Sequence, residues 1–150
     1  MGRPLVFYER IDRDTDEGKR TAERLLALRD ALGREIPVRG VGGTLLLTTW
    51  NMREFDSPSY GQRKDEPLYY MAEIIDRFHL VAIQEVRDDL SALERLMALL
   101  GPWRKYLATD VTGGKPGNRE RMAFLYDSRK VRFGGLAGEV VIPPSRRAAG

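Results

Sequence analysis

The sequence contains no cysteine and only one histidine, His79. The absence of cysteine excludes disulfides, thiolate zinc sites and cysteine nucleophiles. No run of apolar residues approaches the roughly 18 that a membrane span needs, so no membrane partner is expected. The apolar run at residues 5–8 is too short for the core of a signal peptide. A cytoplasmic location is therefore the default expectation.

Charge of neither sign dominates the chain. There are 25 Lys and Arg against 22 Asp and Glu, which gives a formal net charge of +3. This balance is too weak to indicate a nucleic-acid partner by itself. With 42% hydrophobic and 31% charged residues, the composition is typical of a globular chain. The length of 150 residues is enough for one ordinary domain.

Hydrophobic periodicity predicts helices that alternate with strands, followed by further strands. The first helix is expected to start near Thr15 and to end at Gly33, and the third to be capped by Asp88 or Asp89 and to end at Gly101. This order predicts an α/β fold with a sheet of mixed direction. The predicted helices cover residues 15–33, 67–78 and 89–100, and the predicted strands cover residues 44–50, 79–84, 103–109, 120–126 and 131–142.

Two predicted strands are followed by polar residues that could form a site. Asn51 follows the apolar run that ends at Trp50, and Glu85 ends the run that includes Ile83 and Gln84. Sites in open α/β sheets gather at the carboxyl ends of strands, so Asn51 and Glu85 are candidates for one site. Each also has an ordinary interpretation. An asparagine there often forms a turn, and a glutamate often meets solvent or an arginine.

Three segments together resemble the endonuclease/exonuclease/phosphatase superfamily, and especially its deoxyribonuclease I-like branch. They are TTWNMR at residues 48–53, LVAIQEVRD at residues 80–88 and ERMAFLY at residues 120–126. The second segment is the most specific, and the resemblance spans about residues 44–142. Residues 1–43 have no counterpart. We therefore expect a helical extension at 1–43 and a partial superfamily domain at 44–150.

The resemblance implies a role for each matching polar residue. Glu85 would be the main ligand of Mg²⁺, with Mn²⁺ and Ca²⁺ as alternatives, because such ions prefer oxygen donors. Asn51 would contact the metal and orient the scissile phosphate. Glu120 would hold a catalytic histidine in its working tautomer.

The resemblance also implies substrate contacts, with DNA the favoured partner. Arg87 would face the nucleic acid, although an ion pair with a neighbouring aspartate is an ordinary alternative. Asn118 and Arg121 would contact substrate from a basic glycine-rich loop that carries Lys115 and Arg119. Such a loop is also commonly just solvated.

Other parts of the family's active site have no counterpart in this sequence. The family uses an Asp-x-Asn element, an isolated histidine and a terminal Asp-His pair for metal binding and acid–base chemistry. His79 is predicted to be a structural or surface residue, because its place in the sequence does not correspond to any histidine of the family's motifs. The resemblance thus implies the first half of a four-layer α/β sandwich. Its bare sheet face would meet a missing carboxyl-terminal half or cause self-association.

Three functions remain open on the sequence alone. The first is Mg²⁺-dependent phosphodiester hydrolysis, with the chain inactive by itself. The second is a non-catalytic binding or interaction module that keeps the half-fold. The third is a phosphatase of the same superfamily. Whether the chain is an enzyme is therefore not decided by its residues.

Overall fold

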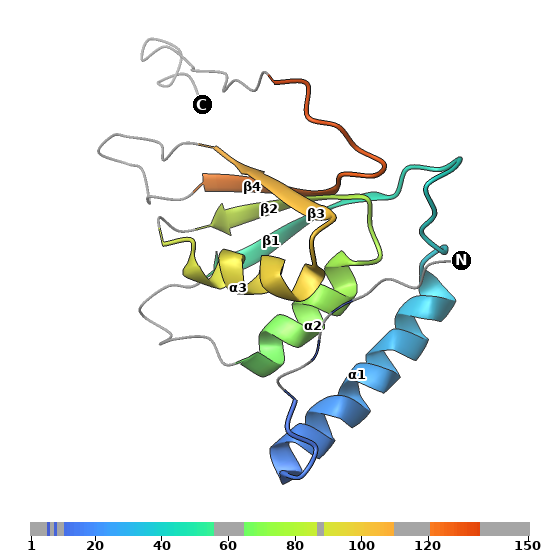
Figure 1. Cartoon of the computed structure of the whole chain (residues 1–150), viewed down its shortest axis with the longest axis vertical. Helices are drawn as coiled ribbons and strands as arrows, with labels where there is room; N and C mark the ends of the chain where they lie inside the picture. The colour runs from blue at the N-terminus through green and yellow to red at the C-terminus, as the bar shows by residue number, and fades with distance from the viewer. Residues whose placement is uncertain are drawn as a thin grey trace, which may run out of the picture.

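The computed structural model describes residues 6, 8, 11–55, 65–86, 89–109 and 121–135, without the side chains of residues 53–55 and 85. In this part of the chain, three helices and four strands form an α/β fold (Figure 1). The predicted fold class is confirmed at this level. The helices are α1 (Asp16–Glu35), α2 (Asp65–Ile75) and α3 (Ser91–Leu100), and the strands are β1 (Leu47–Phe55), β2 (Leu80–Val86), β3 (Arg104–Ala108) and β4 (Arg121–Asp127).

The four strands form one mixed sheet in the order β1-β2-β4-β3. β1 and β2 are parallel, with Leu47 beside Leu80 and Asn51 beside Gln84. β4 is antiparallel to both of its neighbours. A parallel pair cannot be joined by a tight turn, and α2 lies in the connection between β1 and β2. The mixed direction agrees with the sequence-based prediction.

The main core lies between the sheet and the helices α2 and α3, which cover the same face (Figure 1). Alternate residues of the strands point into it, among them Val81, Ile83 and Leu125, each fully buried. Burying one such side chain stabilises the fold by about 1.5–3 kcal/mol. The helices contribute the apolar residues Leu68, Ala72, Ile75, Ala92, Leu93, Leu96 and Leu100.

The opposite face of the sheet carries apolar side chains that the described helices leave open. Leu47 and Leu80 are register partners on this face, and Leu80 is in turn the partner of Tyr126. Leu47 is 60% exposed, while Leu80, Phe124 and Tyr126 are only partly buried. This is called the open face below.

Helix α1 is attached to α2 through charged residues. Arg20 and Arg24 pair with Glu66 at 3.0 and 3.4 Å, and Arg29 makes two hydrogen bonds of 3.0 Å with the buried Glu73. α1 therefore forms a further layer outside α2, held by arginine–carboxylate contacts. None of the described helices is long and apolar enough to cross a bilayer.

The helix boundaries correct several predictions. α1 starts beside Thr15 as expected, and Thr15 is its cap, since its Oγ1 accepts a hydrogen bond from Gly18 N at 3.1 Å. The predicted end at Gly33 is wrong, because Gly33 lacks the positive φ of a terminal glycine and the helix continues to Glu35. α2 begins at Asp65 and ends at Ile75, instead of covering residues 67–78. The predicted end of the third helix at Gly101 is right, since α3 ends at Leu100 and Gly101 follows it with φ at 79°.

Two strand predictions are also corrected. The predicted strand at residues 44–50 lies at Leu47–Phe55, because β2 offers pairing partners only from Leu80 onward. Residues 131–135 form no strand, and the remainder of the predicted strand 131–142 lies outside the described residues.

The predicted cap of α3 is also modified. Asp89 accepts a hydrogen bond of 2.8 Å from Ser91 N, but Leu90 occupies the cap position itself.

Candidate functional site

Asn51 lies within β1, not after its end as the sequence analysis expected, because the strand continues to Phe55. Its side chain is exposed, and its register partner Gln84 is exposed as well. Since parallel register partners share a face, both amide side chains lie on the open face. A neutral amide is thus presented to solvent near the carboxyl end of the parallel pair.

Glu85 is the second-to-last residue of β2, between Gln84 and the fully buried Val86. The structure describes its backbone only. The strand end predicted at Gln84 is therefore extended by two residues, which places the backbone of Glu85 inside the sheet.

Arg121 begins β4 and is the register partner of Val86. Its side chain is partly exposed. Because β4 runs antiparallel to β2, the start of β4 lies at the same end of the sheet as the carboxyl ends of β1 and β2. Three of the sequence-predicted site residues, Asn51, Glu85 and Arg121, thus have backbones at one end of one sheet. Arg87, Asn118 and Glu120 lie outside the described residues.

The pairing of β2 is irregular at this end on both sides. Towards β4, regular pairing stops at Ile83 and resumes at Val86, so Gln84 and Glu85 together oppose Met122. Towards β1, regular pairing stops at Asn51 and resumes at Phe55. Such bulges bend a strand and redirect its side chains, and they are over-represented beside active sites. Both irregularities fall on the segment that the sequence analysis singled out.

The residue types at this end of the sheet include oxygen donors that could bind a hard metal ion. The described side chains alone do not form a complete set of metal ligands. Carboxylate and amide oxygens are the donors that Mg²⁺ prefers, and it commonly keeps several waters. Among the side chains that the structure describes, no three acidic or histidine residues gather into a metal-binding group. The carboxylates of Glu85 and Glu120 are outside that description.

A group of buried ion pairs lies at the opposite end of the sheet. Arg39 joins Asp76, at 2.7 Å, to Asp127. Arg104 is buried beside them, and Arg129 binds Asp127 through two side-chain nitrogens at 2.9 and 2.6 Å. This set of five residues is called the buried charge cluster.

Burial and ion pairing compete within the buried charge cluster. Burial lowers the pKa of Arg104 to about 10, which still leaves it charged at neutral pH. Burial also raises the pKa of Asp76, whose Oδ2 atom is buried without a hydrogen bond. For Asp127, burial opposes ionisation, but hydrogen bonds from Arg129 and the charge of Arg39 outweigh it and hold the pKa at about 2. These groups face one another, so their shifts reflect structural ion pairs and do not indicate catalysis.

His79 lies next to this cluster and away from the candidate site. It is 1% exposed, its Nδ1 accepts a hydrogen bond from Leu46 N at 2.9 Å, and its Nε2 lies 2.7 Å from Gly40 O. Both ring nitrogens are thus occupied by the backbone. The placement agrees with the structural role predicted from the sequence.

The sequence analysis missed the buried charge cluster and Glu73. A signal was present for Glu73, since an acidic residue interrupts an apolar helix face between Ala72 and Ile74. Glu73 accepts hydrogen bonds from Arg29, Arg77 and the Tyr8 hydroxyl. No comparable pattern marks Asp127, whose partner Arg39 lies far away in the sequence, although its other partner, Arg129, is only two residues away.

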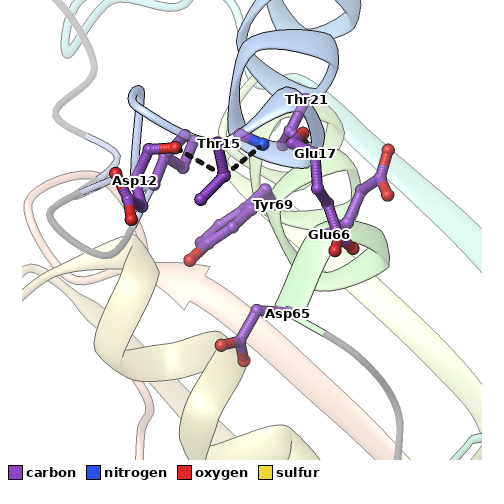
Figure 2. Close-up of a pocket in the computed structure, with 9 residues that line it drawn as sticks. Asp12, Thr15, Glu17, Thr21, Asp65, Glu66 and Tyr69 are labelled. Atoms are coloured by element: carbon purple, nitrogen blue, oxygen red, sulfur yellow. Dashed lines mark hydrogen bonds between the residues drawn. The ribbon is translucent and has the colours of Figure 1, made fainter.

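A separate cavity of about 380 Å³ lies where the amino ends of α1 and α2 meet (Figure 2). Asp12, Glu17, Asp65 and Glu66 give it an acidic lining, and Tyr69 forms part of its wall. None of the predicted site residues lines this cavity. Glu66 is neutralised by Arg20 and Arg24, so the lining contributes to the attachment of α1.

The sequence was compared with protein-family models and with curated proteins. No protein-family model matches the chain, and no curated protein matches it.

Proposed function

We propose that the chain carries part of a Mg²⁺-dependent phosphodiesterase site of the endonuclease/exonuclease/phosphatase type, with DNA as the favoured substrate. The observation that carries the proposal is the convergence of Asn51, Glu85 and Arg121 at one end of the sheet, where pairing is irregular on both sides of β2. Those residues come from three segments far apart in the sequence. Their backbones share one end of the sheet, with the Asn51 side chain on the open face and Arg121 paired with the core residue Val86.

Glu85 and Asn51 would hold the metal ion in this proposal. A bound Mg²⁺ would supply charge stabilisation at the phosphate and a more acidic water. Asn51 can donate a hydrogen bond to a phosphate oxygen from its exposed position. Because the amide is neutral, it does so without adding negative charge beside the substrate.

The remaining predicted residues would bind substrate or orient the acid–base group. Arg121, Arg87 and Asn118 would contact the phosphate backbone, where a guanidinium can make paired hydrogen bonds. Glu120 would orient a catalytic histidine. His79 cannot be that histidine, since it is buried and both ring nitrogens are bonded to backbone. The acid–base group must therefore come from outside this chain, which would be inactive alone.

The open face supports the finer assignment of a four-layer sandwich. Face-to-face sheets pack about 10 Å apart through apolar side chains. Leu47, Leu80, Phe124 and Tyr126 provide such side chains on the face that α2 and α3 do not cover. A second sheet is the partner that fits this surface in the proposed fold.

The metal site can be tested with Mn²⁺, whose unpaired electrons broaden nearby NMR signals. We expect low Mn²⁺ concentrations to broaden the amide signals around Asn51, Glu85 and Arg121 first. Glu85→Ala should abolish this selective broadening. Glu94→Ala, which removes an exposed carboxylate from α3, should leave it unchanged. Broadening that is unaffected by Glu85→Ala would show that the metal site is assigned wrongly.

The reaction can be tested with the same two variants in a plasmid-nicking assay of the whole gene product. Glu85→Ala should reduce Mg²⁺-dependent nicking by more than the roughly 10- to 100-fold that loss of an outer-shell partner costs. Glu94→Ala should keep full activity. Release of phosphate from monoesters without nicking would favour the phosphatase. DNA binding with no divalent requirement and no metal site would favour the binding module.

A further inference from the structure

We propose that the end of the sheet where β3 begins and β4 ends is a binding surface for single-stranded nucleic acid. Trp103 would be the aromatic side chain on which a base stacks. The surface consists of Trp103, Lys105, Ser128, Arg129 and Lys130, and is called the Trp103 surface below. It lies at the opposite end of β4 from Arg121. The inference stands independently of the proposed hydrolysis, because binding here needs neither metal nor catalysis.

Trp103 exposes an unusually large aromatic surface for a fixed residue. The side chain is 59% exposed, although it lies directly before the buried Arg104. The Arg129 guanidinium lies over the ring at 5.7 Å from its centroid, within the range of a cation–π contact. Much of the indole remains accessible to a planar ligand.

The backbone of Trp103 and the Arg129 side chain above its ring are both held by hydrogen bonds. The carbonyl of Trp103 accepts hydrogen bonds from Ser128 N at 2.9 Å and from Ser128 Oγ at 2.8 Å. Arg129 is fixed in turn by the two side-chain contacts with Asp127. A preorganised aromatic and cation pair loses less entropy than mobile side chains would.

The charge around Trp103 is positive and suits a phosphate backbone. In the buried charge cluster, the three guanidinium groups of Arg39, Arg104 and Arg129 face only two carboxylates. Lys105 and Lys130 add positive charge nearby, and no acidic residue occurs in residues 102–105 or 128–134.

A base stacked on an aromatic ring, with cations beside it for the phosphates, is the usual arrangement in sequence-tolerant single-strand binding. A duplex buries its base faces in its own stack and could offer Trp103 no planar partner. We therefore favour a single strand. The six residue steps of β4 separate the Trp103 surface from Arg121 by about 20 Å, so one strand could contact both ends.

The test is fluorescence anisotropy of a labelled oligo(dT) titrated with the full chain at low salt in EDTA. Wild-type protein should bind, with an affinity that falls as salt rises. Trp103→Ala should weaken binding about tenfold, as expected for loss of one stacked base. Trp103→Phe should restore most of the affinity. Arg129→Ala should weaken binding, whereas Lys19→Ala, which removes an exposed cation from α1, should have no effect.

A second readout separates stacking from simple charge attraction. In a Trp50→Phe background, Trp103 is the only tryptophan, and oligo(dT) should quench its emission. Heparin, a polyanion without bases, should not. The proposal is wrong if oligo(dT) fails to bind, if Trp103→Ala binds like wild type while circular dichroism shows it folded, or if duplex DNA or anionic phosphatidylserine vesicles engage Trp103 more strongly than the single strand does.

Discussion

His79 has its protonation state fixed by two backbone contacts. A carbonyl oxygen can only accept a hydrogen bond, so Nε2 must donate to Gly40 O, while Nδ1 accepts from Leu46 N. Burial lowers the pKa of His79 most strongly, and Arg39 and Lys130 lower it further. The hydrogen bond with Gly40 and the charge of Asp127 act in the opposite direction without reversing the shift. The neutral Nε2–H tautomer is therefore the native form.

We expect the free energy of unfolding to depend on His79 in weakly acidic solution. The pKa of His79 is lowered in the folded state, so its contribution is complete above the unfolded pKa of about 6.5. The contribution is lost as pH falls from there through the folded pKa, because the unfolded chain takes up the proton first. Urea unfolding between neutral and mildly acidic pH measures the slope, which should flatten in His79→Gln. An NMR titration showing a pKa above the usual value would contradict this assignment.

At the residue scale, the sequence indicated candidate site positions but not the buried ion pairs. Asn51 and Glu85 were found because polar residues follow apolar runs at strand length. The bulge at Gln84 and Glu85 in β2 could not be predicted, since it depends on where β4 pairs with β2. The ion pairs of Arg39 with Asp127 and of Arg104 with Asp76 were missed because they join segments separated by many residues, and a linear pattern carries no signal of such contacts.

At the element scale, α1 is held to α2 by two carboxylates, Glu66 and the buried Glu73. Glu73 has a side chain that is almost fully buried, and it accepts hydrogen bonds from α1, from Arg77 and from Tyr8. Burial raises the pKa of Glu73, but the hydrogen bonds and charge of its partners outweigh this and give a net lowering. The carboxylate is therefore ionised and charge-paired in the folded protein.

Glu73→Gln should loosen α1 and destabilise the protein by about 2 kcal/mol, within the range for hydrogen bonds to charged groups. Hydrogen exchange should become faster across α1 than in β2. Lys19→Gln is the control, because the Lys19–Asp16 pair is exposed and should contribute less than about 0.5 kcal/mol. If α1 amides exchange at the wild-type rate in Glu73→Gln, another contact must hold the helix.

Element boundaries show why composition alone placed the strands only approximately. Residues 44–46 have the composition of a strand, but they do not pair with β2, which begins only at Leu80. Leu46 instead bonds to the His79 ring through its N–H and to the His79 N–H through its carbonyl. Asn51 and Met52 have mixed composition, yet β1 continues through them because β2 extends alongside to Val86. A strand ends where its partner ends, and that information is not local.

At the scale of the whole molecule, the open face is the surface through which we expect the chain to self-associate. Leu47 stands on this face at 60% exposure, and its neighbours on the same face are apolar and partly exposed. An apolar patch of this kind promotes contact with another surface.

We expect sedimentation velocity to show reversible association of the chain, and Leu47→Gln to shift it towards monomer. The substitution should change the free energy of unfolding by no more than about 0.5 kcal/mol, because Leu47 is mostly exposed. Leu26→Gln is a matched control at 61% exposure on α1, and it should leave association unchanged. A wild-type chain that is monomeric at all concentrations, or equal effects of the two variants, would contradict a role for the open face.

The buried charge cluster also has a consequence for synthesis on the ribosome. Asp76 and Arg39 emerge well before Arg104, Asp127 and Arg129, and a charge buried without its partners is costly. At about 5–20 residues per second, the nascent chain spends several seconds with Asp76 made and Asp127 not yet made. During that time Arg39 can pair with Asp76, but each lacks part of its final set of partners, Asp127 for Arg39 and at first Arg104 for Asp76. β4 is the last of the described strands to be synthesised, so the buried charge cluster is complete only after β4 and the turn that carries Arg129 have emerged.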